Sequence, residues 1–144
     1  MLNLRLGRPE QAVAHFASVA KLEPRSPAAH FNLGTALTVA GRLSEAVGQF
    51  QLALTLRPDY AQAHTNLGGI LLGAGRAAEA VPHLQEATRL DPNSVQARFA
   101  LANAYAAVGQ TAQALEAARA ALALAPPEPM ATALRDAIER YQQQ

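Results

Sequence analysis

Four histidines are the residues of this 144-residue chain with the richest potential chemistry, because an imidazole binds metals and exchanges protons near neutral pH. His30 and His64 are separated by a 34-residue interval, and His15 and His83 are separated by twice that interval. Multiples of one interval indicate repeated positions rather than ligands that converge on one ion. Zinc needs three or four ligands within about 2 Å of one point, and the sequence has no HExxH-like pair. We therefore expect no metal site.

Two other patterns could suggest a catalytic site, but the residues around them argue against it. The glycine-rich run 68–75 lacks the Lys-Ser/Thr pair that ends a phosphate-binding loop, and the only lysine of the chain is Lys21. Asp59 and Asp91 stand beside prolines, where aspartate is an ordinary turn residue. We find no set of nucleophile, base and orienting group, so we expect no catalytic residue, no cofactor and no enzymatic activity in this chain.

Glycines and prolines at a constant interval define the elements that hold these side chains. Successive glycines of one set and successive prolines of another are each separated by the same 34-residue interval, and each glycine precedes its proline by half of that interval. The glycines are Gly7, Gly41, Gly75 and Gly109, and the prolines are Pro24, Pro58, Pro92 and Pro126. Glycine accepts the positive φ of a tight turn and proline stops a helix, so each unit reads as helix, glycine turn, helix, proline turn. The pattern predicts an all-α fold with six repeat helices near 27–40, 43–56, 61–74, 77–90, 95–108 and 111–124. Two further helices are predicted, at 9–22 and 129–142.

Composition excludes several classes of partner. Twelve Lys+Arg and eleven Asp+Glu are interspersed, which argues against a nucleic-acid binder. No uncharged apolar run approaches the roughly 20 residues of a membrane span, and the first residues do not read as a signal peptide. We expect a cytoplasmic protein that binds neither nucleic acid nor membrane. The absence of cysteine excludes disulfides.

The units resemble the tetratricopeptide repeat, whose pattern is aromatic-x2-Leu-Gly-x2-Tyr, Ala-x3-Phe and Pro. The first unit reads His30-x2-Leu33-Gly34-x2-Leu37, Ala46-x3-Phe50, Pro58; the second reads His64-x2-Leu67-Gly68-x2-Leu71, Ala80-x3-Leu84, Pro92; and the third reads Arg98-x2-Leu101-Ala102-x2-Tyr105, Ala114-x3-Ala118, Pro126. The third is the most degenerate. His or Arg replaces the first aromatic throughout, and we expect these long side chains to cover apolar surface instead.

The resemblance implies a right-handed α-solenoid in a single domain, 1–144, that binds proteins. We divide it into an incomplete repeat at 1–26, full repeats at 27–60, 61–94 and 95–128, and a capping helix at 129–144. In such repeats the first helix of each unit lines a concave groove for an extended peptide or a partner helix. The matching positions that we expect to bind peptide are Phe31, Asn32, Thr35, Gln62, Thr65, Asn66, Gln96, Phe99 and Asn103.

No residue at these positions is charged, so the Lys/Arg clamp of chaperone adaptors is absent. Asn32 and Asn66 instead resemble the asparagine ladder of the O-linked N-acetylglucosamine transferase repeats, in which a carboxamide holds the peptide backbone. In motif the repeats are most similar to those of these transferases and of bacterial repeat proteins. In the third unit Ala100 takes the ladder position, with Asn103 nearby. Two plainer interpretations stay open: Asn-Leu-Gly is a common repeat sequence, and Phe31 and Phe99 tuck between helices.

Three alternatives to a simple peptide-binding scaffold also stay open. The first alternative is the recognition arm of a larger enzyme such as a glycosyltransferase, and the second is a module that self-assembles. The third is an RNA-reading helical repeat, which would need a basic groove. The alternative of self-assembly rests on the apolar residues of the N-terminal helix. Helix 9–22 presents Val13, Phe16 and Val19, while residues 1–6 are too few for a complete first helix. We therefore predict a homodimer through the N-terminal unit.

Overall fold

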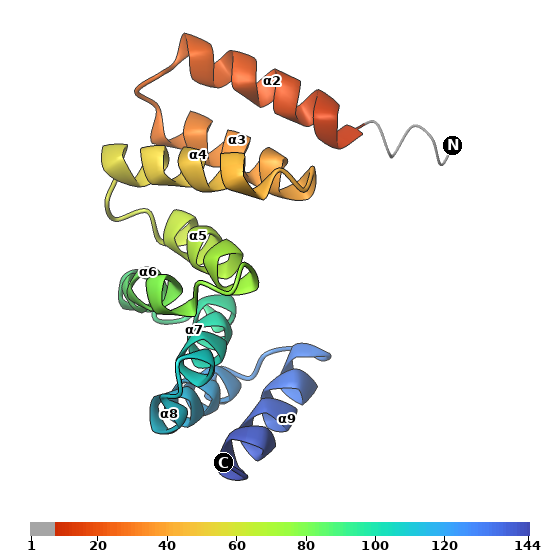
Figure 1. The fold of residues 1–144 in the computed structure, drawn as a ribbon, viewed down its shortest axis with the longest axis vertical. Helices are drawn as coiled ribbons and strands as arrows, with labels where there is room; N and C mark the ends of the chain where they lie inside the picture. Colours follow the sequence, from red (N-terminus) through yellow and green to blue (C-terminus); the bar gives the residue numbers. More distant parts are fainter. Residues whose placement is uncertain (1–7) are drawn as a thin grey trace. The chain divides into compact units, whose positions relative to one another are not determined.

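The computed structural model describes residues 8–144, and every regular element in that range is an α-helix (Figure 1). The helices are α2 (Arg8–Leu22), α3 (Pro27–Val39), α4 (Leu43–Leu56), α5 (Ala61–Gly73), α6 (Ala77–Leu90), α7 (Val95–Ala107), α8 (Thr111–Ala123) and α9 (Met130–Gln142). The all-α prediction is confirmed, and every expected helix end agrees to within one residue. The expected features at Gly7 and at residues 1–6 lie outside the described residues.

Local hydrogen bonding explains where the helices begin and end. Ser26 and Ser94 cap α3 and α7, since each side-chain oxygen accepts a hydrogen bond at 3.1 Å from the backbone N–H three residues later. Gly41, Gly75 and Gly109 have φ of 76°, 77° and 81°, the left-handed conformation that closes a helix. The residue after each glycine donates its backbone N–H to a carbonyl five residues back, as from Arg42 to Leu37 at 2.9 Å.

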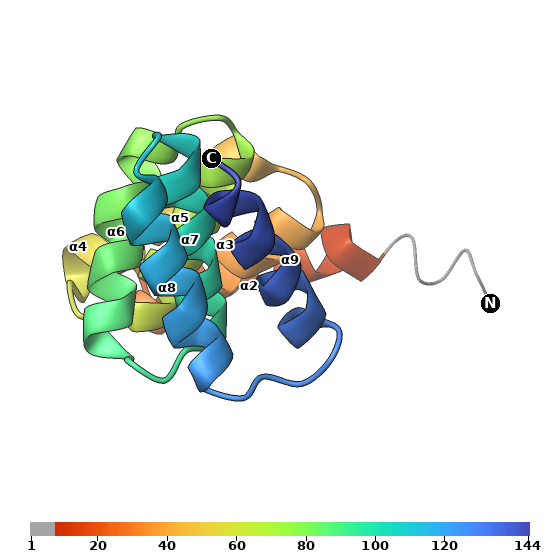
Figure 2. The same ribbon diagram turned by 90° about the horizontal axis from the view of Figure 1, so that it is seen from below.

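Contacts between residues divide the chain into two compact units, Met1–Leu67 and Gly68–Gln144, with the division inside α5. In the first unit α2 packs on α3, and α3 packs on α4. In the second unit α6 packs on α7, α7 on α8, and α8 on α9 (Figure 2).

A small residue on the first helix of each repeat faces position 50, 84 or 118 on the second helix. A Cβ added to Gly34 would lie 2.9 Å from Phe50 Cε1, and one added to Gly68 would lie 2.5 Å from Leu84 Cγ. Both distances are below normal contact, so these positions need glycine for helix packing. In the third repeat Ala102 and Ala118 take the two positions, and both are fully buried. Ala102 is larger than the glycine of the other repeats, and Ala118 is smaller than their Phe50 and Leu84. This exchange of size between the two positions accounts for the degenerate third motif.

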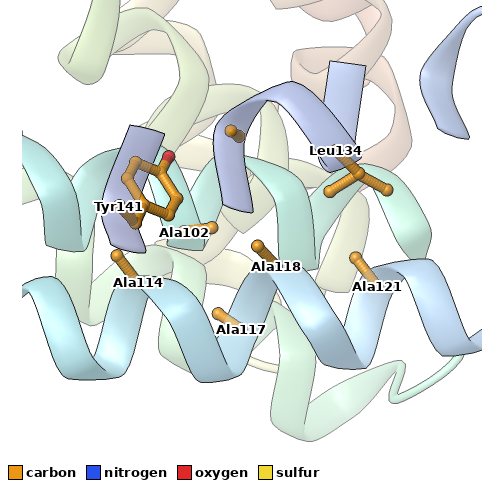
Figure 3. Close-up of a cluster of buried hydrophobic side chains, with 8 residues drawn as sticks. Ala102, Ala114, Ala117, Ala118, Ala121, Leu134 and Tyr141 are labelled. Carbon is orange, nitrogen blue, oxygen red and sulfur yellow. The ribbon is translucent and has the colours of Figure 1, made fainter. Parts of the chain in front are cut away.

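The alanines of the third repeat form a cluster with the last helix. Tyr141 and Leu134 of α9 lie over a row of α8 alanines (Figure 3). The buried members are Ala102, Ala114, Ala117, Ala118, Ala121, Leu134, Ala137 and Tyr141. Small side chains on α8 let α7 and α9 pack closely against it.

The side chains that replace the first aromatic of the repeat hold the turn before their helix. His30 Nε2 lies 2.9 Å from the carbonyl oxygen of Pro24, and His64 Nε2 lies 2.8 Å from that of Pro58. Arg98 Nε donates to the carbonyl of Pro92 at 2.7 Å. The expectation that these residues merely cover apolar surface was incomplete. Each one fixes the proline carbonyl six residues back, and this constant spacing is visible in the sequence.

Candidate functional site

Helix α2 has two apolar faces, and only one of them is buried. Val13 and Ala20 are buried where α2 packs on α3, whereas Phe16 is half-exposed. Its repeat equivalents Phe50, Leu84 and Ala118 are all fully buried. Ala12 and Val19 are half-exposed too, and the equivalents of both in the three full repeats are again fully buried. We call Ala12, Phe16 and Val19 the open face of α2.

The open face borders a groove of about 540 Å³ between α2 and α3. Its lining residues are Arg8, Pro9, Ala12, Phe16, Asn32, Thr35, Ala36 and Val39. Most of this lining is apolar, and Arg8 is its one charged member among residues 8–144. Val39 is 70% exposed. The groove therefore combines an uncovered apolar surface with the amide of Asn32.

Among the nine predicted site residues, Asn32 and Thr35 are the two that line this groove. Thr35 Oγ1 donates to the carbonyl of Phe31 at 3.0 Å, and Asn32 is exposed. Gln62 is exposed on α5, and Asn66 is half-buried there. Thr65 is only 8% exposed, and its hydroxyl donates to Ala61 O at 3.0 Å. Thr65 therefore offers a ligand little surface.

Phe31 and Phe99 both pack inside their units. Phe31 stacks on Tyr60 with a centroid separation of 4.8 Å and meets Phe50 at 5.7 Å. The Arg57 guanidinium lies 4.6 Å from the centre of the Tyr60 ring. Phe99 is half-buried against the alanine cluster of α7, α8 and α9. Only part of each ring remains for a ligand, and contact with a peptide stays a prediction for both.

In the second unit the capping helix reaches a predicted site residue. Tyr141 OH donates to Asn103 Oδ1 at 2.9 Å, so this amide oxygen already has a partner on α9. Burial raises the pKa of the Tyr141 phenol, which keeps it a hydrogen-bond donor. Gln96, by contrast, is exposed on the first turn of α7.

Three charged side chains near the groove are tied to one another. Arg42 donates to Glu45 at 2.7 Å and to Glu10 at 3.1 Å, which links α2 to the turn before α4. The hydrogen bond from Arg42 lowers the pKa of Glu45.

Arg8, Pro9 and Ala36 were not predicted from the sequence as residues that line the groove. The signal for the open face was present, since Ala12 and Phe16 repeat Ala46 and Phe50 at the 34-residue interval.

Within residues 8–144, no three His, Asp or Glu side chains lie together as a metal site. None of the helices of that range has both the length and the apolar character that a membrane span requires.

The sequence profile of the tetratricopeptide repeat matches residues 2–61 and 40–94, and a second profile of the same repeat matches residues 71–138. The chain belongs to the tetratricopeptide repeat family. Its fold is an all-α solenoid of stacked helix–turn–helix repeats, and the chain is of the protein-interaction scaffold type.

Several solved structures resemble this chain over most of its length. MamA from Desulfovibrio magneticus RS-1 is 25% identical with a TM-score of 0.80, over 97% of this chain and 87% of that one. MamA AMB-1 is 25% identical with a TM-score of 0.83, over 97% and 81%. The Arabidopsis OM64 TPR domain is 20% identical with a TM-score of 0.74, over 82% and 95%, a likeness of fold alone. A search of curated proteins found no match.

Proposed function

We propose that this chain binds an extended peptide or a partner helix of another protein through the polar side chains of α3 and α5. The observation that carries the proposal is the α2–α3 groove, which joins an uncovered apolar face to Asn32 and Thr35. Asn32, Gln62 and Asn66 would contact the peptide backbone, because a carboxamide both donates to a carbonyl and accepts from an N–H. Gln96 is exposed and keeps its predicted role, and Phe31, Thr65, Phe99 and Asn103 keep theirs with less free surface.

A selection from a library of displayed random peptides tests this proposal. Peptides that bind the 144-residue chain are synthesised, and their dissociation constants are measured for the parent chain and for Asn32→Ala/Asn66→Ala. Two lost hydrogen bonds should weaken binding by about 1–3 kcal/mol. Binding should change little between low and high salt, because Arg8 is the single charged residue among residues 8–144 that lines the groove.

The matched control is Gln51→Ala, which removes an exposed amide from α4 on a surface that does not line the groove. Equal losses for the control and the double variant would contradict the proposal. A steep salt dependence would also contradict it, since it would place the peptide on a charged surface.

A second candidate function is self-association through the N-terminal unit. It is favoured by the half-exposed Phe16, whose equivalents in the three full repeats are buried beneath a neighbouring helix. Sedimentation of the chain over a range of concentrations should show a dimer, and Phe16→Glu should shift the population to monomer. A strictly monomeric chain up to high micromolar concentration would contradict self-association. The cytoplasmic location and the absence of enzymatic activity remain predictions.

A further inference from the structure

The open face of α2 carries opposite charges at its two ends. At 100° per residue, Arg8, Ala12, Phe16, Val19 and Glu23 form one stripe along the helix. Glu23 follows the last helical residue and continues the spiral, since its N–H donates to Val19 O at 2.8 Å. Arg8 and Glu23 are both exposed, and neither forms an ion pair with another residue in 8–144. The stripe therefore runs from a cation through an apolar centre to an anion.

Such a stripe is complementary to itself when two copies lie antiparallel. A two-fold axis at the middle of the stripe places Arg8 of one copy opposite Glu23 of the second, and Ala12 opposite Val19 of the second. His15 then faces Phe16 of the second copy. His15 already lies edge-on to Phe16 within one chain, with ring centroids 5.1 Å apart. The four rings would thus meet at the centre, where aromatic side chains contribute most to an interface.

We propose that two copies of this chain dimerise through α2, packed antiparallel against α2 of the other copy, with reciprocal Arg8–Glu23 pairs at the ends. This geometry rests on the self-association proposed above and specifies its surface and its register. The contact is isologous and closes on two subunits, so it does not propagate into a filament. It covers Phe16 and Val19 of each copy, and it brings the exposed Val39 to the edge of the contact. The antiparallel arrangement also opposes the two helix dipoles favourably.

Charge inversion tests the register without disturbing the apolar centre. Arg8→Glu leaves two acidic ends on the stripe, and Glu23→Arg leaves two basic ends. Each variant alone should repel its own second copy and raise the dimer dissociation constant about three- to thirtyfold, as expected for two exposed pairs. An equimolar mixture of the two variants should restore dimerisation, because each basic end then meets an acidic end. The double variant Arg8→Glu/Glu23→Arg should likewise dimerise as the parent does.

Sedimentation velocity between about 1 and 300 μM measures these constants, and circular dichroism checks that every variant keeps its helices. Phe16→Glu should raise the dissociation constant at least about tenfold. Leu52→Glu is the matched control, since Leu52 is an exposed apolar residue of α4 outside the stripe and the groove. It should leave the dimer unchanged.

The outcomes separate the register from the self-association itself. If Phe16→Glu dissociates the dimer but the mixed charge variants do not recover it, then the N-terminal surface associates and the antiparallel register is wrong. If Leu52→Glu dissociates the dimer and Phe16→Glu does not, the contact lies elsewhere and both proposals fail. A parent chain that stays monomeric over the whole range also overturns both.

Discussion

The same three repeat positions have opposite environments on α2 and on α8. On α2 they are Ala12, Phe16 and Val19, all half-exposed. On α8 they are Ala114, Ala118 and Ala121, all fully buried in the cluster with α7 and α9. The larger side chains thus lie on the less covered helix. Hydrophobicity at a repeat position does not determine its burial, because a helix of a solenoid is buried only by the helices beside it.

Covering a helix from two sides also limits the size of its side chains. Alanines on α8 let α7 approach from one side and Tyr141 and Leu134 of α9 from another. On α2 no such limit applies within the described residues, and Phe16 projects into the groove. The C-terminal unit is therefore closed by its own chain, whereas the open face of α2 is the surface on which we place a partner.

The largest expected effect is on stability at the closed end. Leu134→Ala removes a fully buried side chain from the alanine cluster and should destabilise the chain by about 2–5 kcal/mol. Phe16→Ala should cost less than about half of this, because Phe16 is already partly in water. Urea unfolding followed by circular dichroism, at a concentration where the chain is monomeric, compares the two. Equal losses would show that α2 is as well covered as α8.

The next largest effect tests whether α5 and α6 must approach each other closely at Gly68 and Leu84. Gly68→Ala forces a Cβ against Leu84 and should cost about 1–3 kcal/mol of unfolding free energy. The double variant Gly68→Ala/Leu84→Ala should lose less stability than the two single variants added together, because it has the same residue pair as Ala102 and Ala118 in the third repeat. The control is Gly69→Ala, whose Cβ meets nothing within 4 Å and which should stabilise α5 by up to about 1 kcal/mol. An additive double variant would contradict direct contact across the helix pair.

A smaller effect concerns the hydrogen bond that ties α9 to α7. Tyr141→Phe removes the donor to Asn103 Oδ1 and should cost about 0.5–1.5 kcal/mol. Asn103→Ala should cost little more once Tyr141 is Phe, so a double-mutant cycle measures the coupling. Tyr105→Phe is the control, since its hydroxyl partner Gln85 is exposed. A cycle without coupling would separate the closure of α9 from this hydrogen bond.

The smallest effect is a pH dependence at the start of α9. Hydrogen bonds from Thr132, then from Arg135, hold the pKa of Glu128 below its ordinary value of 4.5. A lowered carboxylate pKa stabilises the fold above the ordinary value, and this contribution is lost as the pH falls through the lowered pKa. Glu128→Gln should therefore flatten the stability profile slightly below about pH 4.5. An unchanged profile, or a Glu128 pKa by NMR titration at or above the ordinary value, would contradict this assignment.

The helices were predictable because their signals are local. Gly41, Gly75 and Gly109 adopt the positive φ that the spacing required, and Ser26 and Ser94 cap the helices that follow them. The site was less predictable. Asn32 and Thr35 do line a groove, whereas the amide oxygen of Asn103, which was predicted to bind peptide, accepts a hydrogen bond from Tyr141. Tyr141 lies 38 residues away, beyond the reach of the repeat pattern.

The sequence by itself determined the 34-residue unit, the helix boundaries and the turns, because backbone hydrogen bonds and φ preferences act over a few residues. The tertiary structure alone decided which apolar faces are covered. Phe16 and Phe50 share one repeat position, yet Phe50 lies against Gly34 and Phe16 borders an open groove. Burial depends on what packs against a side chain, and in a repeat protein that neighbour changes where the residue type does not.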